Sequence, residues 1–221
     1  MRTTEGYKKL SKGEFTRAAD RYETDHAGVY AICRKDYPDI LTEIEKESFT
    51  DLLDAGCGTA PMLSLLTERF PDAHFTGIDI TPKMIEVAKE KHLPNTTLVC
   101  ADCENMPFEQ ESFDVIICSQ SFHHYPNPDN FFASVWRCLR PNGRLILRDM
   151  TMPCRSLHWF VNNIELPFLN LLGYGDVHVY NRRELQALCD QTGLVLESFE
   201  RRKGLKLHAV IRKVGNKLPI K

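Results

Sequence analysis

The sequence predicts a doubly wound α/β fold, in which a mostly parallel sheet carries helices on both faces. Three observations predict it. From residue 50 onward, strand-like and helix-like segments alternate in the order of repeated βαβ units. The segment FDVIICSQ (113–120) is almost uninterruptedly apolar, as a central strand covered on both faces must be. The first strand runs into Asp54-x-Gly56-x-Gly58, and such sheets bind ligands at turns of this kind.

Length and composition agree with one such domain and a modest appendage. The chain has 221 residues, of which 43% are hydrophobic and 26% are charged, and these are ordinary globular values. A net charge of −2 gives no strong field that would favour nucleic acid. Most of the eight cysteines stand in apolar runs, so we expect free thiols in a reducing compartment and a cytoplasmic location. The lone pair Cys100-x-x-Cys103 lacks a second pair, and no metal site is predicted.

The elements follow in order along the chain. Residues 13–47 are expected to be helical, with a break at Pro38 and a second short helix from there to about Glu47, so that 1–48 form an N-terminal helical cap. The domain over 49–221 then begins. Five strands are expected at 50–56, 74–80, 96–102, 113–120 and 144–150. Helices are expected at 61–70, after Thr81-Pro82, which supplies an N-cap and a first-turn proline, and at 129–139.

After the fifth strand the rhythm changes. Residues 152–180 are aromatic-rich and are expected to form a helix and loop inserted at the ligand end of the sheet. Asn181 should cap a helix through Asp190. The last two strands, near 194–199 and 205–212, are joined by a short polar link and should pair as an antiparallel hairpin at the edge. The complete expectation is a seven-stranded sheet whose last strand is antiparallel.

Candidate functional residues stand directly after the predicted strands, because ligands of such sheets bind at the carboxyl ends of the strands. Asp79 ends the second strand, 21 residues beyond Gly58, at the position where a carboxylate accepts hydrogen bonds from a ribose. Asp102 follows the third strand and could face an adenine amino group. The fourth strand runs into Ser119-Gln120-Ser121-Phe122-His123-His124, a polar and aromatic group at the central rim.

At this level of detail the chain resembles the class I S-adenosylmethionine (SAM)-dependent methyltransferases, of the small-molecule type related to ubiquinone and menaquinone methyltransferases. The resemblance is carried by LLDAGCGTA (52–60), FTGIDITPKMIEVAKEK (75–91), ADCENMPFEQESFDVIICSQSFHHY (101–125) and LRPNGRLILRD (139–149). The segments FTRAADRYE (15–23) and NRRELQALCDQTGL (181–194) add to it. These motifs are specific for the cofactor and say little about the methyl acceptor.

The resemblance implies SAM as the cofactor and S-adenosyl-L-homocysteine (SAH) as the product. It implies cofactor contacts from Tyr22, Asp54, Gly56, Gly58, Asp79, Ile80, Asp102, Cys103 and Ser119. The loop from Asp54 to Gly58 and Ser119 would hold the methionine part, Asp79 the ribose, and the residues that follow the second and third strands the adenine. It also accounts for Pro61, because SAM has no pyrophosphate and a third glycine is dispensable where a proline starts the helix.

Methyl transfer from a sulfonium is an in-line displacement that the protein promotes mainly by orienting the acceptor. His123 and His124 are the candidate catalytic bases, and the residues alone do not distinguish between them. The expected partner is a small-molecule acceptor, partly apolar because of the aromatic residues in 152–180, which with 1–35 would cover the site as a lid. No nucleic-acid partner and no membrane span are expected, and the oligomeric state is open.

Four other functions are weighed against this one. A NAD-linked oxidoreductase would want a third glycine in the loop and a Tyr-x-x-x-Lys pair, yet Tyr174 and Tyr180 are followed at that spacing by His178 and Glu184. A non-enzymatic SAM-binding protein would not need the polar rim after the fourth strand. A nucleic-acid methyltransferase would carry an N/D-P-P-Y/F motif there, and a protein arginine methyltransferase would carry paired glutamates.

Overall fold

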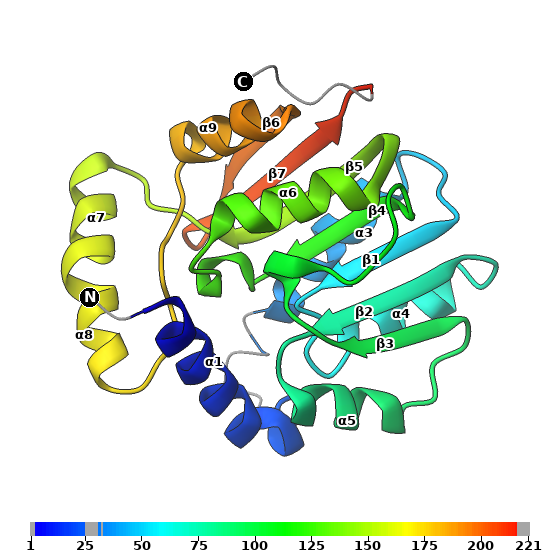
Figure 1. The fold of residues 1–221 in the computed structure, drawn as a ribbon, viewed down its shortest axis with the longest axis horizontal. Helices are drawn as coiled ribbons and strands as arrows, with labels where there is room; N and C mark the ends of the chain where they lie inside the picture. Colours follow the sequence, from blue (N-terminus) through cyan, green and yellow to red (C-terminus); the bar gives the residue numbers. More distant parts are fainter. Residues whose placement is uncertain (1–2, 25–30, 32, 216–221) are drawn as a thin grey trace.

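The computed structural model describes residues 3–24, 31 and 33–215, and its centre is a seven-stranded sheet in the order β3-β2-β1-β4-β5-β7-β6 (Figure 1). The strands are β1 Asp51–Ala55, β2 His74–Asp79, β3 Thr96–Cys100, β4 Phe113–Ser119, β5 Leu139–Met150, β6 Leu194–Arg202 and β7 Lys206–Lys213. The pairs among β1 to β5 are parallel, and β7 is antiparallel to both β5 and β6. The predicted sheet is confirmed, including the antiparallel hairpin of β6 and β7 at its edge, in which β6 is the outermost strand.

Helices cover both faces of this sheet, as a doubly wound fold requires. One face packs against α6 Pro128–Cys138 and α9 Arg182–Thr192, and the other against α3 Tyr37–Ile44, α4 Pro61–Arg69 and α5 Pro82–Glu90. Successive strand residues point to opposite faces, so Ile116 packs in the first of these cores and Ile117 in the second, and both are fully buried. The apolar run of the fourth strand is explained by this double burial.

The helix starts agree with the turn chemistry in the sequence. Pro61 occupies the first turn of α4, after Ala60 in a left-handed conformation with φ 61°. The helix α9 carries a capping box in which the Asn181 side chain accepts from the backbone of Glu184 and the Glu184 side chain accepts from the backbone of Asn181. Thr81 precedes α5 as predicted, but its side chain makes no capping hydrogen bond.

The N-terminal prediction is wrong in its boundaries. The first helix, α1 Thr4–Ala18, begins well before residue 13, and Thr3 caps it by accepting from the backbone N–H of Gly6. Pro38 lies in the first turn of α3, which is the second short helix predicted after the break, and α3 ends at Ile44, a few residues before the predicted end near Glu47. A short 3-10 turn, η1 Ala19–Arg21, follows α1, and another, η2 Arg34–Asp36, precedes α3. Residues 25–30 and 32 of the predicted helix lie outside the described residues.

The insertion after β5 is helical, as predicted. It consists of α7 Arg155–Phe160, a wider π-type turn η5 Val161–Glu165, and α8 Leu166–Leu171, and it lies with α1 beyond the ends of the parallel strands (Figure 1). Val161, Leu166 and Val179 form a small core beneath it. Among the helices of the described ranges, none is both long enough and apolar enough to cross a bilayer.

Candidate active site

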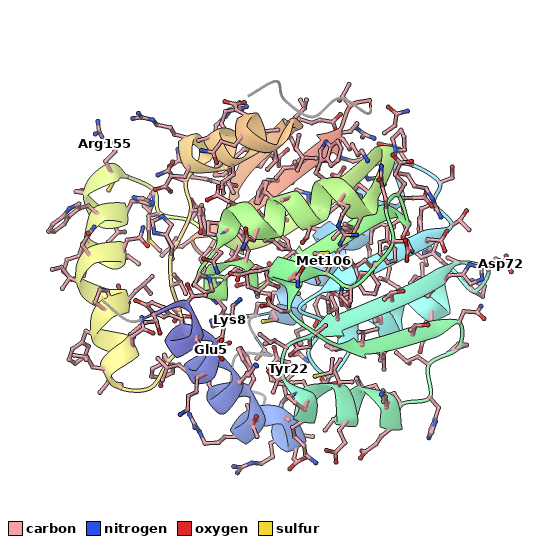
Figure 2. The ribbon with its side chains drawn as sticks, viewed as in Figure 1. Glu5, Lys8, Tyr22, Asp72, Met106 and Arg155 are labelled. Atoms are coloured by element: carbon pink, nitrogen blue, oxygen red, sulfur yellow. The ribbon has the colours of Figure 1, made fainter. Side chains whose placement is uncertain are left out.

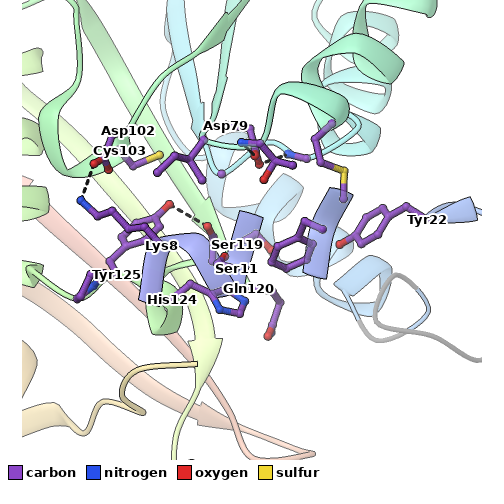
Figure 3. A pocket seen from close by; sticks show the side chains of 18 residues that line it. Lys8, Ser11, Tyr22, Asp79, Asp102, Cys103, Ser119, Gln120, His124 and Tyr125 are labelled. Carbon is purple, nitrogen blue, oxygen red and sulfur yellow. Dashed lines mark hydrogen bonds and ion pairs between the residues drawn. The ribbon is translucent and has the colours of Figure 1, made fainter. Parts of the chain in front are cut away.

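A cavity lies between α1 and the carboxyl ends of the central parallel strands (Figure 3). It encloses about 670 Å³ of space outside the protein atoms, including the space open to solvent at its mouth. Nine of the residues proposed from the sequence line it: Tyr22, Gly56, Gly58, Asp79, Ile80, Asp102, Cys103, Ser119 and His124. Two others, Asp54 and His123, lie behind the wall.

The glycine loop from Asp54 to Gly58 forms one wall of the cavity, and its two glycines have different surroundings. Gly56 has φ 81°, and a Cβ there would lie 2.0 Å from Oγ of Ser121, so the loop is held tightly against the turn after β4. Gly58 has φ 54°, and a Cβ there would meet no atom within 4 Å. Gly58 therefore turns its open side toward empty space, where a ligand can approach the backbone.

Two acidic groups stand at the end of β1 and β2. The Asp79 carboxylate accepts hydrogen bonds from the backbone N–H of Gly58 (3.0 Å) and of Thr81 (2.7 Å). These bonds lower the pKa of Asp79, but burial raises it by more, so the net shift is upward. Asp54 is only 3% exposed, and burial together with the charge of Asp79 raises its pKa to about 7. A positively charged ligand near this pair would favour the ionised form of both groups.

The far wall is made by residues that leave β3 and β4. Asp102 caps the turn η3 Cys103–Asn105 by accepting from the backbone N–H of Glu104. Lys8 of α1 reaches over the cavity and contacts both Asp102 and Glu104, and Figure 3 draws the bond between Lys8 and Asp102. The Oγ atoms of Ser119 and Thr81 are buried and have no hydrogen-bond partner among the described residues, so each can still bind a ligand.

The two histidines lie in the turn η4 Phe122–His124 and face different surroundings. His123 is held by Asp149, whose carboxylate contacts the ring Nδ1 at 2.7 Å and accepts from the backbone N–H of His123. His124 lines the cavity, and its Nδ1 lies 3.3 Å from Oδ1 of Asp176. The same Asp176 oxygen lies 3.4 Å from Nε2 of His123, which joins both rings to the segment after α8.

The charges of the two rings are set by these neighbours. Burial alone would lower the pKa of His123, but the Asp149 carboxylate, helped by Asp176, raises it to about 9. Burial and the adjacent charge of His123 lower the pKa of His124 to about 4. At neutral pH His123 is therefore a charged imidazolium. His124 is a neutral imidazole, and this is the ring that faces the cavity.

The side chains of His123, His124 and Asp176 also bring potential metal-ligand atoms within 4.8 Å of one another, as do His158, His178 and Glu184 beside α9. In the first group the imidazolium of His123 would have to lose its proton before a cation could bind. The raised pKa of His123 therefore opposes metal binding at this site.

Known proteins resemble this chain in sequence. Residues 53–147 match a family described as a methyltransferase domain. A demethylmenaquinone methyltransferase of Thermotoga maritima is 28% identical over 182 residues, which is 78% of each chain. A phthiotriol/phenolphthiotriol dimycocerosates methyltransferase of Mycobacterium leprae is 38% identical over 112 residues, covering 50% of this chain and 42% of the relative. The match therefore spans less than half the length of that relative.

Solved structures share the fold. A SAM-dependent methyltransferase of Aquifex aeolicus superimposes with a TM-score of 0.66 at 17% identity over 92% of this chain and 99% of the other. The 1,6-didemethyltoxoflavin-N1-methyltransferase of Burkholderia thailandensis, solved with bound SAH, gives 0.69 at 16% identity over 97% and 92%. In the sequence of residues 53–147 and in its fold, this chain is similar to methyltransferases.

Two residues of this site were missed by the sequence reasoning. Lys8 and Glu23 fasten the N-terminal segment over the cavity: Lys8 pairs with Asp102, while Glu23 accepts from Oγ1 of Thr59 in the glycine loop and from Lys91 after α5. Lys8 lies in a polar stretch without an apolar stripe, and no local pattern marked it. Glu23 ends the segment 15–23 that adds to the resemblance, but its charge was not singled out.

The end of β5 contributes to this site through one residue, and one other expectation needs correction. Arg148 and Asp149 are adjacent and point to opposite faces of β5. Asp149 holds His123, whereas Arg148 is buried against Asp36 at 2.9 Å. The aromatic residues of the insertion were expected to line an acceptor pocket, but Trp159 and Phe168 are exposed at the surface, and Tyr180 packs in the core against Phe122.

Proposed function

We propose that the protein binds SAM in this cavity and moves its methyl group to a small, partly apolar acceptor. The observation that carries the proposal is the layout of one cavity. The glycine loop, the Asp79 carboxylate at the end of β2 and the neutral imidazole of His124 all line this one cavity. The names of the Thermotoga maritima and Mycobacterium leprae relatives, which refer to a demethylated menaquinone and to dimycocerosates, support a small-molecule acceptor.

At the cofactor end we assign roles by position. Asp79 accepts from ribose hydroxyls, because its carboxylate faces the cavity and has lone pairs beyond the two backbone bonds. Asp102 and Cys103 lie at the adenine edge, and Ile80 packs on the ring. Gly58 and Ser119 bind the methionine part, and Tyr22 closes that end from the cap.

Three features of the cavity fit a cofactor of this kind. Gly58 leaves open space beside the backbone. The hydroxyl groups of Ser119 and Thr81 lack partners within the described part of the chain. The acidic pair of Asp54 and Asp79, whose pKa values are raised by burial, would be stabilised as carboxylates by the ammonium and sulfonium charges of SAM. Asp54 does not line the cavity, so we assign it a long-range electrostatic effect on the bound cofactor and no direct contact.

SAM, when bound, supplies an activated methyl carbon and a good leaving group. The protein then has to hold the acceptor in line and manage its proton. His124 faces the cavity as a neutral imidazole and can accept that proton, while Asp176 compensates the charge that develops. Asp149 fixes His123, so His123 serves as a positioning residue that keeps the adjacent ring in place.

The remaining cavity walls support an acceptor that is partly apolar. Phe15 of α1 packs edge-on against the His124 ring at 5.2 Å between centroids, and Met84 and Tyr125 also line the space. Because α1 contributes Phe15, Ser11 and Lys8 to the wall, it acts as a lid that excludes water once both substrates are bound.

Isothermal titration with SAH, SAM and NAD tests the proposal. We expect SAH and SAM to bind and NAD to give no heat. Asp79→Asn should weaken SAH binding about 10- to 100-fold, because a charged hydrogen bond is lost. Asp72→Asn, in an exposed turn far from the cavity (Figure 2), should bind as the unmodified protein does. Binding of NAD in place of SAH would contradict the proposal and support the alternative function of a NAD-linked oxidoreductase.

A further inference from the structure

The insertion after β5 exposes an unusual amount of apolar surface. Of the eleven large apolar side chains that are exposed in the described residues, seven lie between 159 and 174. They include Trp159, Phe160, Ile164, Phe168, Leu171 and Leu172, and their exposed fractions run from 47% for Phe160 to 75% for Leu171. Single exposed apolar residues are normal in a globular protein, but a concentration of this kind marks an interaction site.

These side chains form one continuous ridge, which we call the insertion ridge. Phe160, Ile164 and Phe168 follow one another at a spacing of four along α7, η5 and α8, and Leu171 and Leu172 continue it, so they share one side of a helical column. Figure 1 shows this column standing at the outer edge of the molecule, away from the sheet. Between residues 156 and 175 the only acidic or basic side chain other than a histidine is Glu165, so charge does not interrupt the ridge.

A basic groove runs beside the ridge. Arg155, Arg182, Arg183 and Arg201 line it, together with Trp159 from the ridge itself. Arg201 donates to the carbonyl of Pro153, and within the described ranges none of the four pairs with a carboxylate. Arg155 stands at the outer end of α7 in Figure 2. Because the chain as a whole has a net charge of −2, this positive charge is local.

We propose that the insertion ridge and the basic groove dock the protein onto the surface of an anionic lipid bilayer. A helical ridge of aromatic and aliphatic side chains can enter the boundary between head groups and acyl chains while the helix lies along the surface. Arginines beside it then meet lipid phosphates. A second copy of the chain fits less well, because a two-fold contact centred on Trp159 would bring the same unpaired arginines together.

The ridge is joined to the acceptor end of the cavity. The chain leaving α8 passes close to α1, where a Cβ on Gly175 would lie 2.7 Å from Cα of Ser11, and the backbone N–H of Gly175 donates to Glu14. The next residue is Asp176, which contacts His124. Docking would therefore place the acceptor end of the cavity near the bilayer. This inference rests on the proposed function insofar as the bilayer supplies the acceptor, but the docking itself does not require methyl transfer.

Co-sedimentation with vesicles tests the docking. We expect the protein to pellet with vesicles of phosphatidylcholine and phosphatidylglycerol, to stay in solution with phosphatidylcholine alone, and to be released by high salt. The double variant Phe168→Glu/Leu171→Glu and the double variant Arg182→Glu/Arg183→Glu should each lose about tenfold or more of the binding. The control is Leu65→Glu on α4, which places a carboxylate on an exposed leucine away from the ridge.

Thermal denaturation with and without SAH separates this proposal from the proposed function. A ridge variant that keeps its melting temperature and its stabilisation by SAH, yet no longer pellets, supports docking. Equal pelleting of the ridge variant and the Leu65→Glu control overturns it, as does a lack of binding to anionic vesicles. A dimer in light scattering that Phe168→Glu dissociates, without vesicle binding, also overturns it in favour of a second copy. Loss of SAH stabilisation in the unmodified protein would instead refute the proposed function.

Discussion

The ammonium group of Lys8 lies 2.6 Å from the carboxylate of Asp102, and this contact fastens the N-terminal helix to the end of β3. Lys8 also contacts Glu104, whose side chain is 2% exposed and accepts from the side chain of Asn127 at 2.8 Å. The ion pair therefore closes the cavity over a position that we assign to the adenine edge. The N-terminal helix is therefore held by the same carboxylates that lie at the proposed cofactor end of the site.

Lys8→Met should loosen α1 without unfolding the sheet. The substitution keeps the aliphatic stem but leaves the buried Glu104 carboxylate with only its bonds to Asn127, which should cost about 1–3 kcal/mol locally. Hydrogen exchange should rise in α1 and stay unchanged in β4 and β5. Lys9→Met, at the adjacent exposed position, is the control. Exchange in α1 that is equal in both variants would mean that Lys8 does not hold the cap.

The two glycines of the loop should respond differently to the same change. Gly56→Ala forces a Cβ into contact with Ser121 at a positive φ, so we expect it to destabilise the fold by about 2–4 kcal/mol in urea denaturation. Gly58→Ala meets no protein atom and should cost only about 1 kcal/mol, but its methyl group enters the space assigned to the cofactor and should weaken SAH binding. The reverse pattern would remove Gly58 from the binding surface.

Most of the sheet and the cofactor end of the site could be predicted because both depend on local sequence. Ile116 and Ile117 are apolar at adjacent positions only because both faces of β4 are covered. Asp79 and Ser119 end strands whose carboxyl ends share one edge of the sheet, so their place in the cavity follows from the strand boundaries.

The rest depends on contacts between distant parts of the chain. Lys8 meets Asp102 across 94 positions, and Asp36 meets Arg148 across 112, and neither pairing leaves a local pattern. The start of α1 was missed because its sequence is polar nearly all round. The prediction for the insertion was wrong for a different reason. Trp159 and Phe168 are aromatic, as residues that line an apolar pocket often are, and only the path of α7 and α8 shows that they face outward.

Asp54 should make the stability of the ligand-free protein fall as the pH rises from about 4 to about 7. Its pKa is raised from 3.8 to about 7 in the folded state, so the folded protein binds a proton that the unfolded chain has already released in this range. Asp79 shifts in the same direction. Urea denaturation should show a shallower pH slope for Asp54→Asn than for the unmodified protein. An unchanged slope would show that Asp54 ionises normally in the folded state.

His124→Ala should separate catalysis from cofactor binding. His124 lines the cavity at the acceptor end, away from Asp79, so its removal should lower kcat by about 100-fold or more and leave SAH affinity within about twofold. The assay is methyl transfer to a short-chain demethylmenaquinone, the acceptor class named for the Thermotoga maritima relative. His74→Ala, whose imidazole is exposed on β2, is the control and should be silent.

The pH profile of the same reaction tests the protonation of the pair. Because burial and the charge of His123 lower the pKa of His124 to about 4, His124 is neutral across the neutral range, and kcat should stay level there and fall only as the pH approaches 4. His123→Gln removes the neighbouring charge and should move that fall to higher pH, toward the ordinary histidine value of 6.5. An inflection near 6.5 in the unmodified protein, or one that His123→Gln leaves in place, would show that the charge of His123 does not lower the pKa of His124.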